Sequence, residues 1–235
     1  MPSTDPYLTL TSSLPYPGDL FTAKETPCSR YKLDDRLRML TAEDATLLQD
    51  IEALLQWSHQ PIARTDGEVV ALARALAPSL RNDTLRSVVD HRMNQRTLVA
   101  ALRRRKRGDD APPANVPWGY SRWLDHIARH WREPAFGLTR EFPWLPEANR
   151  LLDAEDSVAL ERVLLGANWA WLGQASMGHD FDFEAVVIYV LRWNVIDRWT
   201  SYSGDAARDR FHTLVDAGLA GFTDVFNEGS THVGH

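Results

Sequence analysis

Hydrophobic residues recur every three to four positions along most of this sequence, which is the spacing of amphipathic helices. The first such stripe consists of Leu47, Leu48, Ile51, Leu54 and Leu55, and it follows Thr41, a residue type that caps helix N-termini. The pattern predicts helices over 41–57, 68–77, 84–108, 118–131, 153–176, 181–199 and 205–226. We therefore expect a mostly α-helical bundle.

The N-terminal stretch departs from the helical spacing. Tyr7, Thr9 and Thr11 alternate with Leu8 and Leu10, which is the two-residue period of a strand. The sequence therefore predicts a short N-terminal β-strand or hairpin over 7–15, added to the helical bundle.

A loop divides the predicted helices into two groups. Residues 109–117 read "DDAPPANVP", a composition typical of loops. We expect a single helical body over 1–235 with two lobes, about 1–108 and about 118–226, joined by this loop. The polar residues 227–235 are expected to form a mobile tail.

Composition narrows the class of protein. The 235-residue chain has a formal net charge of -6 and one cysteine, Cys28, so a disulfide framework within the chain is impossible. No apolar run approaches the roughly 20 residues that span a bilayer, and the N-terminus does not resemble a signal peptide. We expect a cytoplasmic protein that reaches a membrane only indirectly, through a complex.

A basic run stands out in this acidic chain. The stretch "VVDHRMNQRTLVAALRRRKRG", Val88 to Gly108, ends in five consecutive cations, Arg103, Arg104, Arg105, Lys106 and Arg107. Nucleic-acid binding through this run is one alternative. The run has no aromatic neighbours, and a helix C-terminus attracts cations through its macrodipole. We therefore favour a charged helix end that contacts a protein partner, with no nucleic acid.

The same predicted helix carries a stripe of polar and small residues. Asp90, Asn94, Thr97, Ala101 and Arg105 fall within roughly 80° of one another at 100° per residue. Asparagine and threonine are poor choices for an exposed helix face. We therefore expect this stripe to bond to a neighbouring element.

Two groups of residues suggest an alternative, a metal-dependent enzyme. His126 and His130 stand at i and i+4, a spacing that holds metals on a helix, but the glutamate of the HExxH pattern is missing. The stretch "GHDFDFE", residues 178–184, adds one histidine and three carboxylates. It also stands where an N-cap and an acidic first turn belong, and we favour that interpretation. No cofactor is expected.

The predicted late helix, "FDFEAVVIYVLRWNVIDRW", is apolar on all sides and is therefore expected to be buried by the fold or by partners. Its polar and aromatic residues, Glu184, Tyr189, Arg192, Trp193 and Trp199, are candidates for partner contact or for positioning the helix.

Three stretches together resemble known proteins. "YLTLTSSLPYP" and the late helix are similar to a bacterial family of uncharacterised proteins encoded beside V/A-type rotary ATPase subunits. Val88 to Gly108 resembles helices of the C subunit of these ATPases, called d in vacuolar enzymes, with Asp90, Asn94, Arg104 and Gly108 as the matching residues.

The resemblance implies a non-catalytic helical subunit, or an accessory or assembly factor, of a proton- or sodium-translocating ATPase. The C subunit links the central axle to the membrane rotor ring, so the expected partners are other ATPase subunits. The expected location is the cytoplasmic side of the inner membrane, through the complex. The chain is shorter than a typical C subunit, and the opening strand is not one of its known features.

Overall fold

The computed structural model describes residues 6–56, 64–114 and 116–201, and within these ranges the chain is helical with no strand. The α-helices are α1 Pro6–Ser13, α2 Arg30–Leu37, α3 Ala42–Leu55, α4 Asp66–Leu76, α5 Asp83–Lys106, α6 Leu124–Arg129, α7 Leu145–Asp153 and α8 Ser157–Ala175. A further helix covers 183–201. Short 3₁₀ turns occupy Leu20–Thr22, Ala77–Ser79 and Pro134–Gly137.

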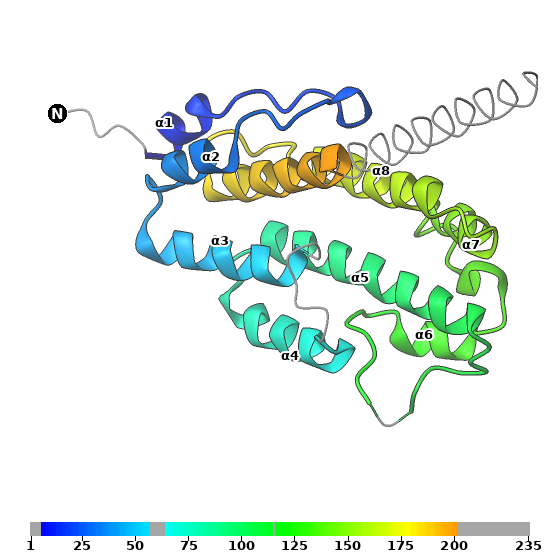
Figure 1. Cartoon of the computed structure of the whole chain (residues 1–235). Coiled ribbons are helices and arrows are strands. Elements are labelled where there is room, and N and C mark those ends of the chain that lie inside the picture. Colours follow the sequence, from blue (N-terminus) through cyan, green and yellow to red (C-terminus); the bar gives the residue numbers. More distant parts are fainter. Residues whose placement is uncertain (1–5, 57–63, 115, 202–235) are drawn as a thin grey trace, which may run out of the picture.

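The long helix α5 lies in the middle of the molecule. Figure 1 shows α3 and α5 between α4 and α6 on one side and α8 with the helix over 183–201 on the other. Helix α5 contacts α3, α7 and α8, and α7 packs closely against α8. Its 24 residues make it about 36 Å long, so it passes through most of the fold.

The predicted N-terminal strand is wrong, because residues Pro6–Ser13 form α1. Pro6 suits a first helical turn, where its missing N–H has no helical partner. The hydroxyl of Thr11 donates to the carbonyl of Tyr7 at 2.8 Å, which suits a helix. Leu10 is fully buried, and Tyr7 and Leu14 pack against the same core. Tyr7, Leu10 and Leu14 are spaced i, i+3 and i+7, so one face of a helix buries all three. A strand with the two-residue alternation would place them on both faces.

The apolar side chains form two clusters. The first cluster combines residues from α1 to the first half of α5 with residues 165–196. The second cluster combines the second half of α5 with α6, α7 and the start of α8, residues 98–164. The boundaries fall inside α5 and α8, so these clusters differ from the lobes predicted at the 109–117 loop. The predicted helix over 205–226 and tail over 227–235 lie outside the described residues.

Several predicted helix ends are confirmed. Thr41 caps α3, its Oγ1 accepting a hydrogen bond from the Asp44 N–H at 3.1 Å. Helix α5 ends as predicted, because Gly108 adopts φ +93°, a conformation that favours glycine after a helix. Its N–H donates to the Arg105 carbonyl at 3.0 Å.

Two segments differ from their predictions. The helix expected over 118–131 is reduced to α6, because residues 118–121 instead pass along α5 in a non-helical conformation. Conversely, α7 forms within a proline-containing stretch. Pro146 is tolerated there because it stands in the first turn of the helix.

Candidate functional site

The polar stripe on α5 holds the segment between Trp118 and Phe136 against the helix. The Ser121 hydroxyl donates to Asn94 Oδ1 at 2.6 Å. Thr97 Oγ1 accepts from the Tyr120 N–H at 3.1 Å and lies 3.2 Å from the Tyr120 carbonyl oxygen. The prediction that this stripe bonds to a neighbouring element is therefore confirmed for Asn94 and Thr97.

A cavity of about 650 Å³ lies beside this stripe, between α5 and residues 119–124. Asp90 and His91 line it from α5, and Trp171 lines it from α8. The His91 ring stacks on Trp171 with centroids 4.2 Å apart and an interplanar angle of 9°. Burial raises the pKa of Asp90 above its ordinary value, while nearby Arg122 acts against that shift.

The basic run at the end of α5 largely makes contacts within the chain. Arg105 donates to the carbonyls of Trp131 and Glu133 at 3.2 and 2.8 Å, and its guanidinium lies 4.6 Å from the centre of the Phe136 ring. It also donates to Asn149 Oδ1 of α7 at 2.8 Å. These contacts fix the end of α5 to the second cluster.

The remaining cations of the run divide into two groups. Arg104 pairs with Asp66 at 3.1 Å, and Lys106 donates to the Leu152 carbonyl at 2.7 Å. Arg103 and Arg107 are exposed, and Lys106 is exposed as well despite its contacts. The surface available to a partner is therefore formed by Arg103, Lys106 and Arg107.

On another face of α5 lies a cleft of about 590 Å³, which we call the arginine cleft. Its walls come from the end of α3, the start of α4, α5, α8 and the helix over 183–201. Among the described residues, the cleft has seven arginines and two carboxylates: Arg64, Arg92, Arg96, Arg103, Arg104, Arg107 and Arg198 against Asp66 and Glu161. A strongly basic cleft in a chain of net charge -6 is a local concentration of one sign of charge.

Four of these arginines form a stripe along α5. Arg92, Arg96, Arg103 and Arg107 fall within about 60° of one another at 100° per residue. Both carboxylates of the cleft pair with arginines outside this stripe. Asp66 pairs with Arg104 at 3.1 Å and also lies 3.7 Å from Arg96 of the stripe. The carboxylate of Glu161 pairs with the Arg198 guanidinium at 2.8 Å.

Burial and the positive charge of neighbouring arginines lower the pKa values of two arginines in the cleft. Burial lowers the pKa of Arg92 to about 10, and the positive charges of Arg96 and Arg198 act in the same direction. Burial also lowers the pKa of Arg96, with Arg64 and Arg103 adding to the effect. A pKa near 10 leaves the Arg92 guanidinium protonated at neutral pH.

The histidine pair and the acidic cluster lie apart. The rings of His126 and His130 stack with centroids 4.2 Å apart; His126 Nε2 lies 3.0 Å from the Phe136 carbonyl oxygen, and His130 Nδ1 lies 2.7 Å from Glu133. The Glu133 carbonyl accepts a hydrogen bond from Arg105 near the end of α5, whereas His179 contacts Thr84 near the start of α5. Thr84 and Arg105 are about 32 Å apart along the helix axis, so the two groups lie at opposite ends of α5.

In the acidic cluster, His179, Asp182 and Glu184 have potential ligand atoms within 4.8 Å of one another. Each of them has a protein partner. His179 Nδ1 lies 2.6 Å from Asp182, whose other oxygen accepts from the Ala185 N–H at 2.8 Å, and Glu184 accepts from Asn82. The prediction that this stretch caps the late helix is therefore confirmed.

The other predicted residues of the late helix pack within the fold. Arg192 lies 3.9 Å from the centre of the Trp169 ring. Trp193 is buried and donates from Nε1 to the Cys28 carbonyl at 2.9 Å. Tyr189 is half-buried, and burial raises the pKa of its hydroxyl, with Cys28 adding to the effect. Trp199 meets the Phe21 ring edge-on at 5.1 Å.

The sequence analysis did not single out Arg92 and Arg96, which line the arginine cleft. The signal was present, because a helical projection of the basic residues places both with Arg103 and Arg107. The contributions of Arg64 and Arg198 came from distant elements, and no local pattern connected them with α5.

Comparisons with known proteins add a family. Within the described residues, no helix is long and apolar enough to cross a membrane. No curated protein and no solved structure matches the chain. A family model described as "Protein of unknown function (DUF2764)" matches residues 48–220. Because the match extends over most of the sequence and includes α5, α8 and the late helix, the chain belongs to the DUF2764 family.

Proposed function

We propose that the chain is a helical subunit or accessory factor of a bacterial V/A-type rotary ATPase, similar in role to the central-stalk C subunit. The observation that carries the proposal is the position of the stretch that resembles C-subunit helices. Val88 to Gly108 belongs to α5 and its C-cap, and α5 is the helix around which the other elements pack.

The matching residues support a positioning role for this helix. Asn94 receives the Ser121 hydroxyl, Arg104 pairs with Asp66 at the start of α4, and Gly108 ends the helix with a left-handed turn. A subunit that transmits force by shape and contact needs one long helix fixed at several points along its length. These contacts provide such fixed points.

The exposed end of α5 is the surface that we assign to a partner. Arg103 and Arg107 are exposed there and carry positive charge in an otherwise acidic chain. Charge complementarity between such a surface and an acidic loop of the axle or rotor ring accelerates association and fixes orientation. In this proposal the protein needs no cofactor and reaches the cytoplasmic face of the inner membrane through the complex.

A pull-down tests the proposal. The tagged full-length protein is captured from detergent-solubilised membranes of its own host, and its partners are identified by mass spectrometry. We expect ATPase subunits to be recovered with the wild-type protein and not with an unrelated tagged protein. Recovery of no ATPase subunit would overturn the proposal.

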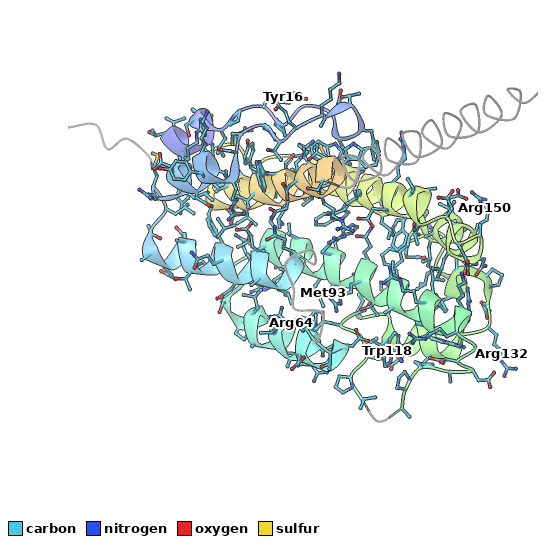
Figure 2. All side chains as sticks on the ribbon, in the orientation of Figure 1. Tyr16, Arg64, Met93, Trp118, Arg132 and Arg150 are labelled. Carbon is cyan, nitrogen blue, oxygen red and sulfur yellow. The ribbon has the colours of Figure 1, made fainter. Side chains whose placement is uncertain are left out.

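Matched charge reversals test the contact surface. The double variant Arg103→Glu/Arg107→Glu should recover less ATPase than the wild type. Arg132→Glu is the control, because Arg132 is also exposed and Figure 2 shows it at the edge of the molecule, away from Arg64 of the cleft. Equal recovery with all three proteins would mean that another surface makes the contact.

A further inference from the structure

We propose that the cavity beside the polar stripe of α5 binds a free aromatic α-amino acid, a role that goes beyond membership of an ATPase complex. This cavity of about 650 Å³, which we call the aromatic cavity, lies between α5 and residues 119–124. It shares no lining residue with the arginine cleft among the described parts of the chain. It combines aromatic rings with charged groups of both signs, and each of these matches a different part of such a ligand.

The charges of the aromatic cavity are balanced. Among the described residues that line it, Arg74 and Arg122 carry positive charge, and Asp90 and Glu141 carry negative charge. A ligand with several charges of one sign would be repelled by two of these groups. A zwitterion, which has one charge of each sign and no net charge, can place each charge near a group of opposite sign.

Asp90 and Arg122 are close enough for their charges to interact, but they are not hydrogen-bonded to each other. Asp90 belongs to α5, and Arg122 belongs to residues 119–124 on the other side of the cavity. Partial burial raises the pKa of Asp90 and the charge of Arg122 acts against that shift, without a hydrogen bond between the two side chains. The ammonium and carboxylate of an α-amino acid are held on one carbon atom, so they can bond to both side chains at once.

The Arg122 guanidinium is held in place by its surroundings. It lies 4.9 Å from the centre of the Trp123 ring, and an arginine over a ring still presents the N–H groups at its edge to a carboxylate. The Ser121 hydroxyl donates to Asn94 Oδ1 at 2.6 Å and accepts from the Trp123 N–H at 3.0 Å. The backbone on both sides of Arg122 is therefore fixed to α5.

The rings of the cavity provide a surface for an aromatic side chain. Tyr120, Trp123, Phe142 and Trp171 all line it. Trp123 and Phe142 meet edge to face with their centroids 6.3 Å apart, which is a favourable geometry for aromatic pairs. A volume of about 650 Å³ lies in the range of small-molecule sites and accommodates a ring together with its charged groups.

His91 provides a separate observation that points to an occupant. Its ring lines the cavity and stacks on Trp171. Its Nε2 atom is buried and has no hydrogen-bond partner among the described residues. Buried side-chain nitrogens are normally hydrogen-bonded. A polar atom that the fold leaves unsatisfied in a cavity wall is expected where a bound molecule completes the site.

A free amino acid fits these features better than an aromatic residue of a partner protein. In a protein chain the α-amino and α-carboxyl groups form peptide bonds and carry no charge. Such a residue would use the rings of the cavity but would leave Asp90 and Arg122 without charged partners.

Isothermal titration calorimetry on the full-length protein tests the proposal with L-phenylalanine as the probe. We expect saturable binding. Phenethylamine lacks the carboxylate, phenylpropionate lacks the ammonium, and L-alanine lacks the ring. Each of these three compounds should bind at least about tenfold more weakly than L-phenylalanine, because each loses either a charge-assisted hydrogen bond or the aromatic contacts.

Two variants connect the charges of the ligand with residues of the cavity. Asp90→Asn and Arg122→Gln should each weaken L-phenylalanine about tenfold, the effect of one lost charge-assisted hydrogen bond. Asp90→Asn should also remove most of the difference in affinity between L-phenylalanine and phenylpropionate, because the ammonium then loses its charged partner. A merely structural role of Asp90 would weaken both compounds equally.

Matched controls make the same changes outside the cavity. Asp125→Asn and Arg132→Gln alter exposed residues that do not line it, and both should leave the affinity for L-phenylalanine within twofold. Circular dichroism confirms that each variant is folded. Neither Asp90 nor Arg122 belongs to an apolar cluster, so neither substitution disturbs the core.

Three results would overturn the proposal. The first is no saturable binding of L-phenylalanine to the folded wild-type protein. The second is an unchanged affinity for L-phenylalanine in both Asp90→Asn and Arg122→Gln, which would place the binding elsewhere. The third is binding of N-acetyl-L-phenylalaninamide as tight as that of L-phenylalanine, which would assign the cavity to an aromatic residue of a partner protein. The pull-down above does not depend on these outcomes, so the two proposals fail separately.

Discussion

At the scale of single residues, His91 shows how position sets chemistry. Its ring stacks on Trp171, and its Nε2 atom is buried without a hydrogen-bond partner among the described residues. Burial lowers the pKa of His91 to about 4, and the adjacent Arg92 acts in the same direction. The protonated ring is therefore disfavoured in the folded protein, and this residue titrates mainly in the unfolded chain.

His91 makes the stability of the protein depend on pH. An unfolded histidine has a pKa of about 6.5, so between pH 6.5 and pH 4 the unfolded chain binds a proton that the folded protein does not. The stability contributed by neutral His91 is complete above pH 6.5 and falls as the pH falls, by at most about 3 kcal/mol at pH 4. Urea unfolding at a series of pH values measures this loss.

Two variants isolate the effect. His91→Phe keeps a ring against Trp171 and removes the titration, so its stability should fall less between pH 7 and pH 4 than that of the wild type. His91→Ala removes both the titration and the stack, and should show the same flatter profile at lower stability throughout. If the free energy of unfolding of His91→Phe falls with pH as steeply as that of the wild type, other groups cause the loss of stability between pH 7 and pH 4.

At the scale of elements, the end of α5 is a structural joint as well as a charged surface. Its sequence pattern correctly predicts the helix and its glycine end, because those depend on local spacing and on φ at one residue. The polar stripe predicts that Arg105 bonds to a neighbouring element. It does not identify the carbonyls of Trp131 and Glu133 as the partners, since those depend on how the 118–136 segment folds.

Arg105→Ala should destabilise the protein by about 2–3 kcal/mol, because two carbonyls and the Asn149 amide lose a shared donor. Arg105→Lys should recover only part of this loss, since an ammonium lacks the guanidinium fork. Arg103→Ala, on the exposed face of the same turn, is the control and should change stability by less than about 0.5 kcal/mol. Similar losses at both positions would contradict the assignment of Arg105 as the joint. Urea denaturation provides the comparison.

Gly119 and Gly173 differ in how much space surrounds them. A Cβ at Gly119 would lie 2.5 Å from Cγ2 of Thr97, which is buried and β-branched, whereas a Cβ at Gly173 in α8 meets no atom within 4 Å. Gly119→Ala should therefore destabilise by about 1–3 kcal/mol by pushing residues 118–121 away from α5. Gly173→Ala should stabilise by about 0.5–1 kcal/mol through helix propensity. Thermal unfolding measures both effects, and the melting temperature should fall for Gly119→Ala and rise for Gly173→Ala. A shift in the same direction for both variants would contradict the close packing at Gly119.

At the scale of the whole molecule, two apolar clusters share two continuous helices. Helix α5 contributes Val89 and Met93 to the first cluster and Leu98 and Leu102 to the second. Helix α8 crosses the same boundary between Leu164 and Leu165. The overall helical class was predictable from hydrophobic spacing. The boundary between clusters was not, because it depends on which faces of α5 and α8 meet distant parts of the chain.

Shared helices predict that both clusters unfold together. Phe136 is fully buried in the second cluster, and Phe136→Ala should cost about 3–5 kcal/mol through loss of apolar contacts and the cavity left behind. The second half of α5 and the start of α8 cannot unfold without weakening the first cluster, which the rest of both helices helps to form. Amide hydrogen exchange should therefore accelerate in α3 about as much as in α7. The exposed substitution Val158→Ala is the control and should leave both rates nearly unchanged. Faster exchange in α6 and α7 alone would show instead that the second cluster opens independently and that α5 frays at the boundary between the clusters.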